Sequence, residues 1–183
     1  AGFGNVGAGV FKHLSQNRDL LSQQPEFVVP APHEAFSGER VLTMDFIEGR
    51  SIETLEIETQ EVRDRAMGLM LDLVLRELFE FGYMQTDPNF ANYLYRGSTG
   101  QIVLLDFGAV QPIAPELAAQ FRALARVALL GGAEATRDAM LRIGYFSQAT
   151  APQHQALIQA MFETAMAPLR QDQPFDFGQS DLL

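Results

Sequence analysis

Three oxygen-bearing side chains, Asp87, Asn92 and Asp106, have types and a spacing that could organise a divalent cation. The first two lie in the polar stretch QTDPNFANY, residues 85–93, and the third directly follows the apolar run IVLL. Magnesium prefers hard oxygen ligands and retains several waters, so one carboxylate and one amide oxygen from the protein are sufficient. We therefore predict that Asn92 and Asp106 bind Mg²⁺. Asp87 would stay off the metal and face an attacking oxygen, as its orienter or general base.

The order of these residues along the chain makes the prediction more specific. An Asp, an Asn five residues later, a predicted β-hairpin and then Asp106-Phe107-Gly108 is the order of the catalytic residues in protein kinases. Phosphoryl transfer requires charge on the phosphates to be neutralised and a hydroxyl or water to be held in line. A hairpin between Asn92 and Asp106 would return the second metal ligand to the first. The alternative interpretation is two unrelated turn or helix-capping motifs.

A second Asp-Phe-Gly occurs at residues 176–178, in a polar tail with no apolar strand before it. Because the catalytic motif needs a strand to carry its Asp to the site, we predict that Asp176 has a structural role and is not catalytic.

The elements that must position the three side chains follow from apolar periodicity and turn residues. The strongest helical pattern spans residues 59–82, opened by Thr59 or Gln60 and closed by Gly82. Two strands joined by Gly-Ser-Thr-Gly then form the hairpin. The other predicted elements are a short helix from Val10 to Ser22, strands at 26–32 and 38–49, a short helix capped by Ser51, and helices at 116–130, 133–143 and 152–167. This order indicates an α+β fold.

Composition excludes several classes of site. The 183-residue chain carries 23 acidic residues against 13 Lys plus Arg, a net charge of −10, which argues against a nucleic-acid partner. It has no Cys, and its three His are far apart, which argues against zinc and disulfide chemistry. No apolar run approaches the length of a transmembrane helix, and no signal peptide is recognisable. We expect a soluble cytoplasmic protein.

Upstream of the long helix, the segment VLTMDFIEGRSIETL resembles the protein-kinase strand that leads into the hinge, where main-chain groups pair with adenine. On this interpretation the nucleotide-binding residues are Met44, Asp45, Phe46, Ile47 and Glu48. Taken alone, the segment is more typical of an ordinary buried strand and turn.

Together, four segments resemble the UbiB family of atypical kinases, also called aarF-domain or ADCK-type kinases: MDFIEGRSI, LRELFEFGYMQTDPNFANYLY, IVLLDFGAV and PFDFG. The resemblance covers about residues 25–180 and is closest to the branch with the QTDPN form. It implies a protein-kinase-like fold, with 25–49 as the end of the N-lobe and the hinge, and 50–183 as a mainly helical C-lobe. It also implies binding of ATP and magnesium, and activity as an ATPase or small-molecule kinase.

The resemblance further implies a role in ubiquinone biosynthesis, with proteins of that pathway and membrane lipid as partners. The expected location is then the bacterial cytoplasm or membrane periphery, or the mitochondrial matrix in a eukaryote. Gln85-Thr86 stands where protein kinases have His-Arg before the catalytic Asp, so control by activation-loop phosphorylation is not expected. Few residues separate Phe107 from the helix predicted near Pro115, which leaves no room for a peptide-docking activation segment.

The N-terminal side departs from the family pattern. The Lys-x-Gly-Gln motif, the Ala-rich phosphate loop, the strand lysine and the acidic helix motif are not found before Phe27. GFGNVG fits a phosphate-loop pattern, but no strand precedes it and the single lysine, Lys12, follows too closely. We therefore expect residues 1–24 to be divergent or truncated. Two other interpretations stay open: an impaired pseudokinase or fragment that binds protein or lipid, and a plain helical interaction domain.

Overall fold

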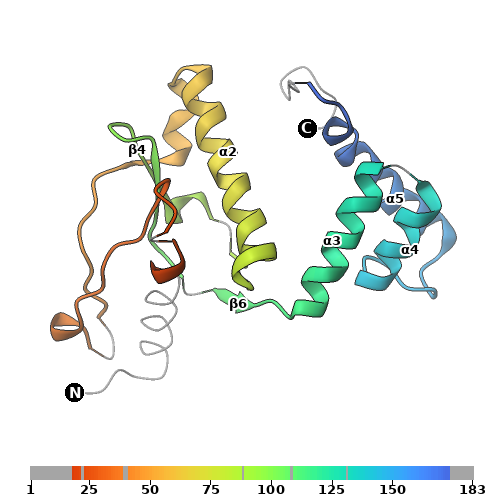
Figure 1. The fold of residues 1–183 in the computed structure, drawn as a ribbon, viewed down its shortest axis with the longest axis horizontal. Helices are drawn as coiled ribbons and strands as arrows, with labels where there is room; N and C mark the ends of the chain where they lie inside the picture. The colour runs from red at the N-terminus through yellow and green to blue at the C-terminus, as the bar shows by residue number, and fades with distance from the viewer. Residues whose placement is uncertain are drawn as a thin grey trace. The chain divides into compact units, whose positions relative to one another are not determined.

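The computed structural model describes residues 18–21, 23–38, 41–87, 89–107, 109–130 and 132–173, and the chain divides into two compact units, Ala1–Ile113 and Ala114–Leu183 (Figure 1). Each unit is described by itself. The candidate phosphate loop at 2–7, Lys12 and the tail motif at 176–178 lie outside the described residues. Of the helix predicted from Val10 to Ser22, only residues 18–21 are described, and they are helical.

The first unit is built on a four-stranded sheet in the order β1-β5-β4-β2. Its strands are β1 (Phe27–Val28), β2 (Arg50–Ser51), β4 (Tyr93–Arg96) and β5 (Gln101–Leu104). β1 pairs parallel to β5, while the β4–β5 and β2–β4 pairs are antiparallel. The β4–β5 hairpin is the one expected from Gly-Ser-Thr-Gly, and Gly100 at φ 70° closes its turn.

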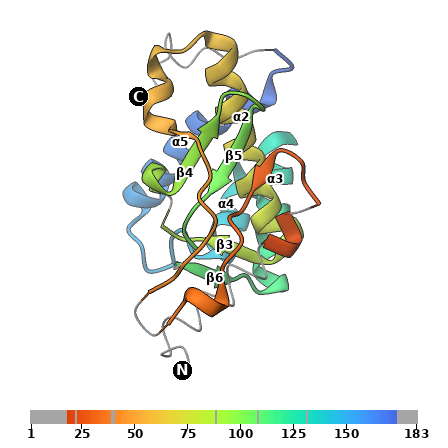
Figure 2. The same cartoon turned by 90° about the vertical axis from the view of Figure 1, so that its left-hand side faces the viewer.

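Helix α2 (Gln60–Arg76) covers one face of this sheet (Figures 1 and 2). Thr59 is its N-cap, with its side chain accepting a hydrogen bond from the Val62 amide, as the sequence predicted. Ala66 and Leu73 are buried against the sheet in a core shared with Phe27, Ile102 and other apolar residues. Before α2, a 3₁₀ helix, η2 (Ile52–Ile57), forms where a short helix was expected. Ser51 occupies its N-cap position, but the Ser51 side chain makes no capping bond.

The long helix does not end at Arg76 but continues as one π-helical turn, η3 (Glu77–Phe81), closed by Gly82 at φ 70°. After this turn, β3 (Tyr83–Gln85) pairs antiparallel with β6 (Val110–Pro112), which lies beyond the hairpin in the sequence. A 3₁₀ turn, η4 (Phe90–Asn92), leads into β4. The sequence indicated neither β3 nor β6, because three-residue strands carry almost no periodic pattern.

The predicted strand at 38–49 is wrong for the residues that the structure describes. Only an isolated bridge between Pro32 and Met44 forms there, beside a 3₁₀ turn, η1 (Glu34–Phe36). Two main-chain bonds flank this bridge, from the His33 amide to the Thr43 carbonyl at 2.8 Å and from the Asp45 amide to the Ala31 carbonyl at 2.9 Å. Beyond them hydroxyl groups take over: Ser37 Oγ accepts from the Thr43 amide at 3.0 Å, and Thr43 Oγ1 donates to the Phe36 carbonyl at 2.8 Å. Such local side-chain bonds give the backbone an alternative to pairing with a strand.

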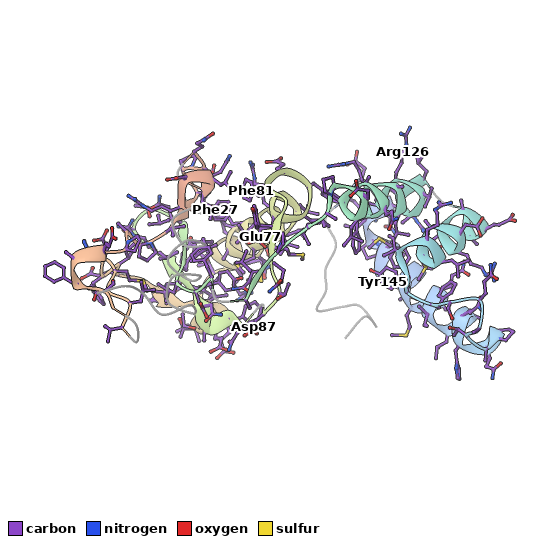
Figure 3. All side chains as sticks on the ribbon, turned by 90° about the horizontal axis from the view of Figure 1, so that it is seen from below. Phe27, Glu77, Phe81, Asp87, Arg126 and Tyr145 are labelled. Atoms are coloured by element: carbon purple, nitrogen blue, oxygen red, sulfur yellow. The ribbon has the colours of Figure 1, made fainter. Side chains whose placement is uncertain are left out.

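The second unit is helical, as expected from its sequence. It contains α3 (Pro115–Leu130), α4 (Ala133–Ile143), α5 (Pro152–Met166) and a 3₁₀ turn, η5 (Pro168–Arg170). Its core consists of Leu124, Ala139, Met140 and Phe146. In Figure 3, Arg126 points away from α3 into solvent, on the face opposite that core. The mixture of helices and small sheets agrees with the predicted α+β class.

Gly82 and Gly68 test how the end of the long helix is determined. We expect Gly82→Ala to destabilise the protein by about 1 kcal/mol, because its positive φ disfavours any residue with a Cβ. Gly68 lies within α2, where an added Cβ would meet nothing within 4 Å, so Gly68→Ala is expected to stabilise by about 0.5–1 kcal/mol. Urea denaturation of both variants measures the difference. Equal effects of the same sign would show that Gly82 does not determine the helix end.

Candidate functional site

Asp87 and Asn92 lie at the two ends of a tight loop between β3 and β4. The Asn89 amide donates to the Asp87 carbonyl at 2.8 Å, and Asn89 Oδ1 accepts from the Ala91 amide at 3.0 Å. The Asn92 amide in turn donates to the Asn89 carbonyl at 3.0 Å. Asn89 is therefore the capping residue of the loop. The side chain of Asp87 is exposed and Asn92 is half-buried, so neither is enclosed in the core.

Asp106 lies just past the end of β5, beside Asn92 across the hairpin. The Leu105 amide donates to the Asn92 carbonyl at 2.9 Å, which extends the β4–β5 ladder to the residue next to Asp106. The Asp106 side chain is exposed, whereas Phe107 is buried. The hairpin thus brings the main chain next to Asp106 up to Asn92, and the assignment of these two side chains to magnesium stays a prediction.

The side chain of Gln85 joins the two acidic segments. Gln85 Nε2 donates to the Asp106 carbonyl at 3.0 Å, and Gln85 Oε1 accepts from the Asp87 amide at 3.3 Å. Thr86 adds two bonds across the same gap, since its amide and its hydroxyl both donate to the Ala109 carbonyl, at 3.2 and 2.7 Å. The structure therefore brings the main chains of Asp87 and Asp106 together.

A buried carboxyl group, Glu77, supports this loop and was not singled out from the sequence. Glu77 is 5% exposed, and its Oε2 accepts from the Gln85 amide at 3.2 Å. Burial raises the pKa of Glu77 to about 7, and the hydrogen bond from Gln85 opposes part of that rise. Figure 3 places Glu77 inside the unit with Phe27 and Phe81, and Asp87 at its margin. The sequence carries no specific signal for it, because an acid within a helical pattern is usually exposed, even at helical spacing from a buried residue such as Leu73.

Tyr93, at the start of β4, lies near several acidic groups of the candidate site, and these affect the pKa of its phenol. Burial raises the pKa of Tyr93 to about 12, and the negative charges of Glu77, Asp87 and Asp106 add to the rise. Three acidic groups therefore lie near enough to Tyr93 to disfavour a further negative charge there. Within the described residues, no three side chains among His, Cys, Asp and Glu form a metal cluster, so a cation would need Asn92, water or ligand oxygens to complete its coordination. Hard oxygen donors of this kind fit magnesium.

The predicted hinge, 44–48, is an extended segment rather than part of a sheet. The Asp45 amide donates to the Ala31 carbonyl at 2.9 Å, and the Asp45 carboxylate accepts from the Ala31 amide and contacts His33 Nε2 at 2.7 Å. Asp45 is thus occupied by structural contacts. Among the described residues, Phe46, Ile47 and Glu48 make no main-chain hydrogen bonds with one another or with neighbouring segments, and the Phe46 side chain is 90% exposed.

A shallow pocket of about 200 Å³ lies beside the loop, lined by Ile52, Glu53, Leu55, Glu56, Arg63, Met67 and Phe90. Its surface is largely apolar. Phe90 belongs to the same 3₁₀ turn as Asn92, so the pocket adjoins the segment that carries a predicted metal ligand.

The sequence matches the model of the ABC1 atypical kinase-like domain over residues 12–137. It is 35% identical over 134 residues to the atypical kinase COQ8, mitochondrial, of Saccharomyces cerevisiae, covering 73% of this chain and 27% of that protein. It is 32% identical over 165 residues to the atypical kinase COQ8B, mitochondrial, of Rattus norvegicus, covering 88% of this chain and 30% of the relative. The chain thus spans under a third of the length of these relatives.

Among solved structures, the fold is similar to Rv3197 of Mycobacterium tuberculosis, determined in complex with erythromycin, with a TM-score of 0.72 and 20% sequence identity. The similarity covers 90% of this chain and 41% of that one. It supports the predicted kinase-like fold. None of the helices in the described part of the chain is long and apolar enough to cross a membrane.

Proposed function

Because the chain belongs to the ABC1 atypical kinase-like family, we propose that its first unit carries the magnesium and phosphate end of an ATP site that serves an ATPase or small-molecule kinase. The observation that carries this proposal is the Gln85 side chain, which bonds the main chains of both Asp87 and Asp106. The catalytic loop and the metal-binding segment are thereby held as one piece.

Each residue has a distinct role in this proposal. Asn92 and Asp106 supply the amide and carboxylate oxygens that hold magnesium. When bound, the ion would neutralise charge on the phosphates. Asp87, exposed at the edge of the unit, accepts a hydrogen bond from the attacking hydroxyl or water and holds it in line. The buried phenol of Tyr93 is protonated at neutral pH, as a phenol with the ordinary pKa of 10 would be, and its pKa of about 12 in this site keeps it so; it therefore adds no further negative charge.

The nucleotide base is proposed to bind at the predicted hinge. Phe46, Ile47 and Glu48 have main-chain groups that no described neighbour uses, and such groups are the usual partners of a purine edge. Met44 lies in an isolated bridge with Pro32, and Asp45 is bonded to Ala31 and His33, so these two residues anchor the start of the proposed nucleotide-binding segment 44–48.

The biological role is proposed to be support of ubiquinone biosynthesis, as the family resemblance implies. The largely apolar pocket beside η4 would suit the ring or short chain of an apolar acceptor, in keeping with such a role. Proteins of the same pathway and a membrane surface are the proposed partners. The location would then be the cytoplasm or membrane periphery of a bacterium, or the mitochondrial matrix of a eukaryote.

The metal assignment predicts that Asp106→Asn weakens binding of Mg-ATP by about ten- to a hundredfold, the loss expected for one charge-assisted contact. Asp176→Asn, the same substitution in the second Asp-Phe-Gly, is the matched control and is expected to change affinity by less than about twofold. Calorimetric titration of Mg-ATP into both variants measures the difference, and chelation of magnesium should abolish binding by the unchanged protein. Magnesium-independent binding, or equal losses in the two variants, would contradict the proposal.

A further inference from the structure

The amide side chain of Gln85 makes bonds in two directions at once. It is 7% exposed, so its polar atoms must find protein partners. Its Oε1 accepts from the Asp87 amide, and its Nε2 donates to the Asp106 carbonyl. The neutral amide supplies an acceptor and a donor at the same time, whereas an ionised carboxylate accepts only and an aliphatic chain does neither.

The backbone of Gln85 is itself fixed from the opposite side. The buried Glu77 carboxyl accepts from the Gln85 amide, and Glu77 is held by the π turn η3 that Gly82 closes. Through β3, Gln85 is also in register with Val110 of β6. The main chain of Gln85 is therefore fixed on both sides. Through its side-chain bonds, Gln85 in turn fixes the main chains of Asp87 and Asp106.

We propose that Gln85 is the positioning residue that sets Asp87 against Asp106, with Glu77 as its support. We call the pair of bonds from the Gln85 side chain to the main chains of Asp87 and Asp106 the clamp. Its importance for function rests on the roles proposed above for the two acids. The geometry of the clamp is a separate claim, since it concerns only how two main-chain segments are held together.

Two variants at Gln85 separate the two bonds, and a third variant elsewhere is the control. Gln85→Leu removes both, while Gln85→Glu keeps the acceptor for the Asp87 amide and loses the donor to the Asp106 carbonyl. The matched control is Gln155→Leu in the second unit. Gln155 is 8% exposed and also works in two directions, with Oε1 accepting from Arg137 at 2.9 Å and Nε2 donating to the Thr150 carbonyl at 2.7 Å. Gln155→Leu is therefore the same chemical change at a similarly buried position, but it does not alter the contacts of Asp87 or Asp106.

The first measurement is amide hydrogen exchange by NMR on the full 183-residue chain, which needs no nucleotide. In Gln85→Leu, the amides of Asp87 and Thr86 are expected to exchange about tenfold faster, because the loop separates from the segment after β5. In Gln85→Glu only the Thr86 amide is expected to accelerate, since Asp87 retains its acceptor. Gln155→Leu should leave both unchanged. Unchanged exchange at both amides in Gln85→Leu, or the same acceleration in Gln155→Leu, would overturn the clamp.

The second measurement is turnover of Mg-ATP at a temperature where circular dichroism shows every variant to be folded. Gln85→Leu is expected to lower kcat roughly tenfold more than it weakens Mg-ATP binding, since misplaced groups affect the transition state most. Gln155→Leu should change neither by more than about twofold. Altered exchange in a protein that neither binds nor hydrolyses Mg-ATP would support the clamp and refute the proposed function. Altered exchange with unchanged kcat would overturn the positioning role.

Discussion

Replacing Asp87 with Asn is expected to lower the turnover of Mg-ATP by about 10²–10⁴-fold while leaving its affinity within a few-fold of the unchanged protein. Asn has the same shape as Asp, and the main-chain carbonyl of residue 87 still accepts the hydrogen bond from the Asn89 amide. The loop should therefore keep its structure. What the proposed mechanism would lose is the negative oxygen that orients the attacking group and takes its proton. A change in kcat without a matching change in affinity is typical of an interaction made only in the transition state.

The control for this prediction is Asp138→Asn, which makes the same change at an exposed Asp on α4. It is expected to leave turnover unchanged to within about twofold. Single-turnover measurements with Mg-ATP, with affinity measured separately by calorimetry, give the two quantities. If the unchanged protein binds Mg-ATP but neither variant alters a turnover that is already negligible, the chain is a nucleotide-binding pseudokinase and Asp87 has no catalytic role.

The second large effect is on stability, and it depends on pH through Glu77. Its pKa is about 7 in the folded protein against an ordinary value of 4.5, because burial disfavours the charged form. A raised pKa in the folded state means that the folded protein holds the proton more tightly than the unfolded chain. The contribution of Glu77 is therefore fully favourable below pH 4.5 and is lost as the pH rises through 7. A difference of this size corresponds to about 3 kcal/mol between the two limits.

Glu77→Gln tests this directly, because the amide keeps the size and the acceptor oxygen but cannot ionise. Urea denaturation of both proteins at pH 5, 7 and 9 should show the variant gaining stability relative to the unchanged protein by roughly 3 kcal/mol across the series. Tyr93, whose pKa is raised to about 12, does not titrate in this window. A constant difference between the two proteins at all three pH values would show that Glu77 does not titrate on unfolding.

The parts of the fold that the sequence predicted are those with local causes. Helix α2 begins at a Thr59 cap and its last turn closes at Gly82, and the hairpin turns at Gly100, so each boundary is determined by residues within a few positions of it. The strand predicted at 38–49 is reduced to an isolated bridge, because main-chain pairing stops after a few bonds and the Thr43 amide bonds to the Ser37 hydroxyl instead of a neighbouring strand. Whether a Ser or Thr hydroxyl bonds to water or to the main chain depends on how the chain folds back. The pattern of apolar residues in the sequence carries no information about this.

The residues of the candidate site likewise fall into those that the sequence could indicate and those that it could not. Asp87, Asn92 and Asp106 could be proposed from the sequence because their types and order match a chemical requirement, and their roles remain predictions. Glu77 could not, because an acid within a helical pattern is usually exposed. It is buried beneath β3, which pairs with β6 through residues that are 25 to 29 positions apart along the chain. Such long-range pairing has no local signal, so the support beneath the loop became visible only in the structure.

The pairing of β6 with β3 has a consequence for inhibitors of the site. Phe107 is 2% exposed, and the chain after it enters β6 at Val110 and α3 at Pro115, so little slack is available. A ligand that binds only after Phe107 has left the core must first expose that ring, at a cost of about 1.5–3 kcal/mol, and it disturbs the bond from the Val110 amide of β6 to the Phe107 carbonyl. Its apparent Kd would be weakened by at least about tenfold relative to a ligand that accepts Phe107 in place. Compounds selected against this protein should therefore favour the conformation with the aromatic ring buried.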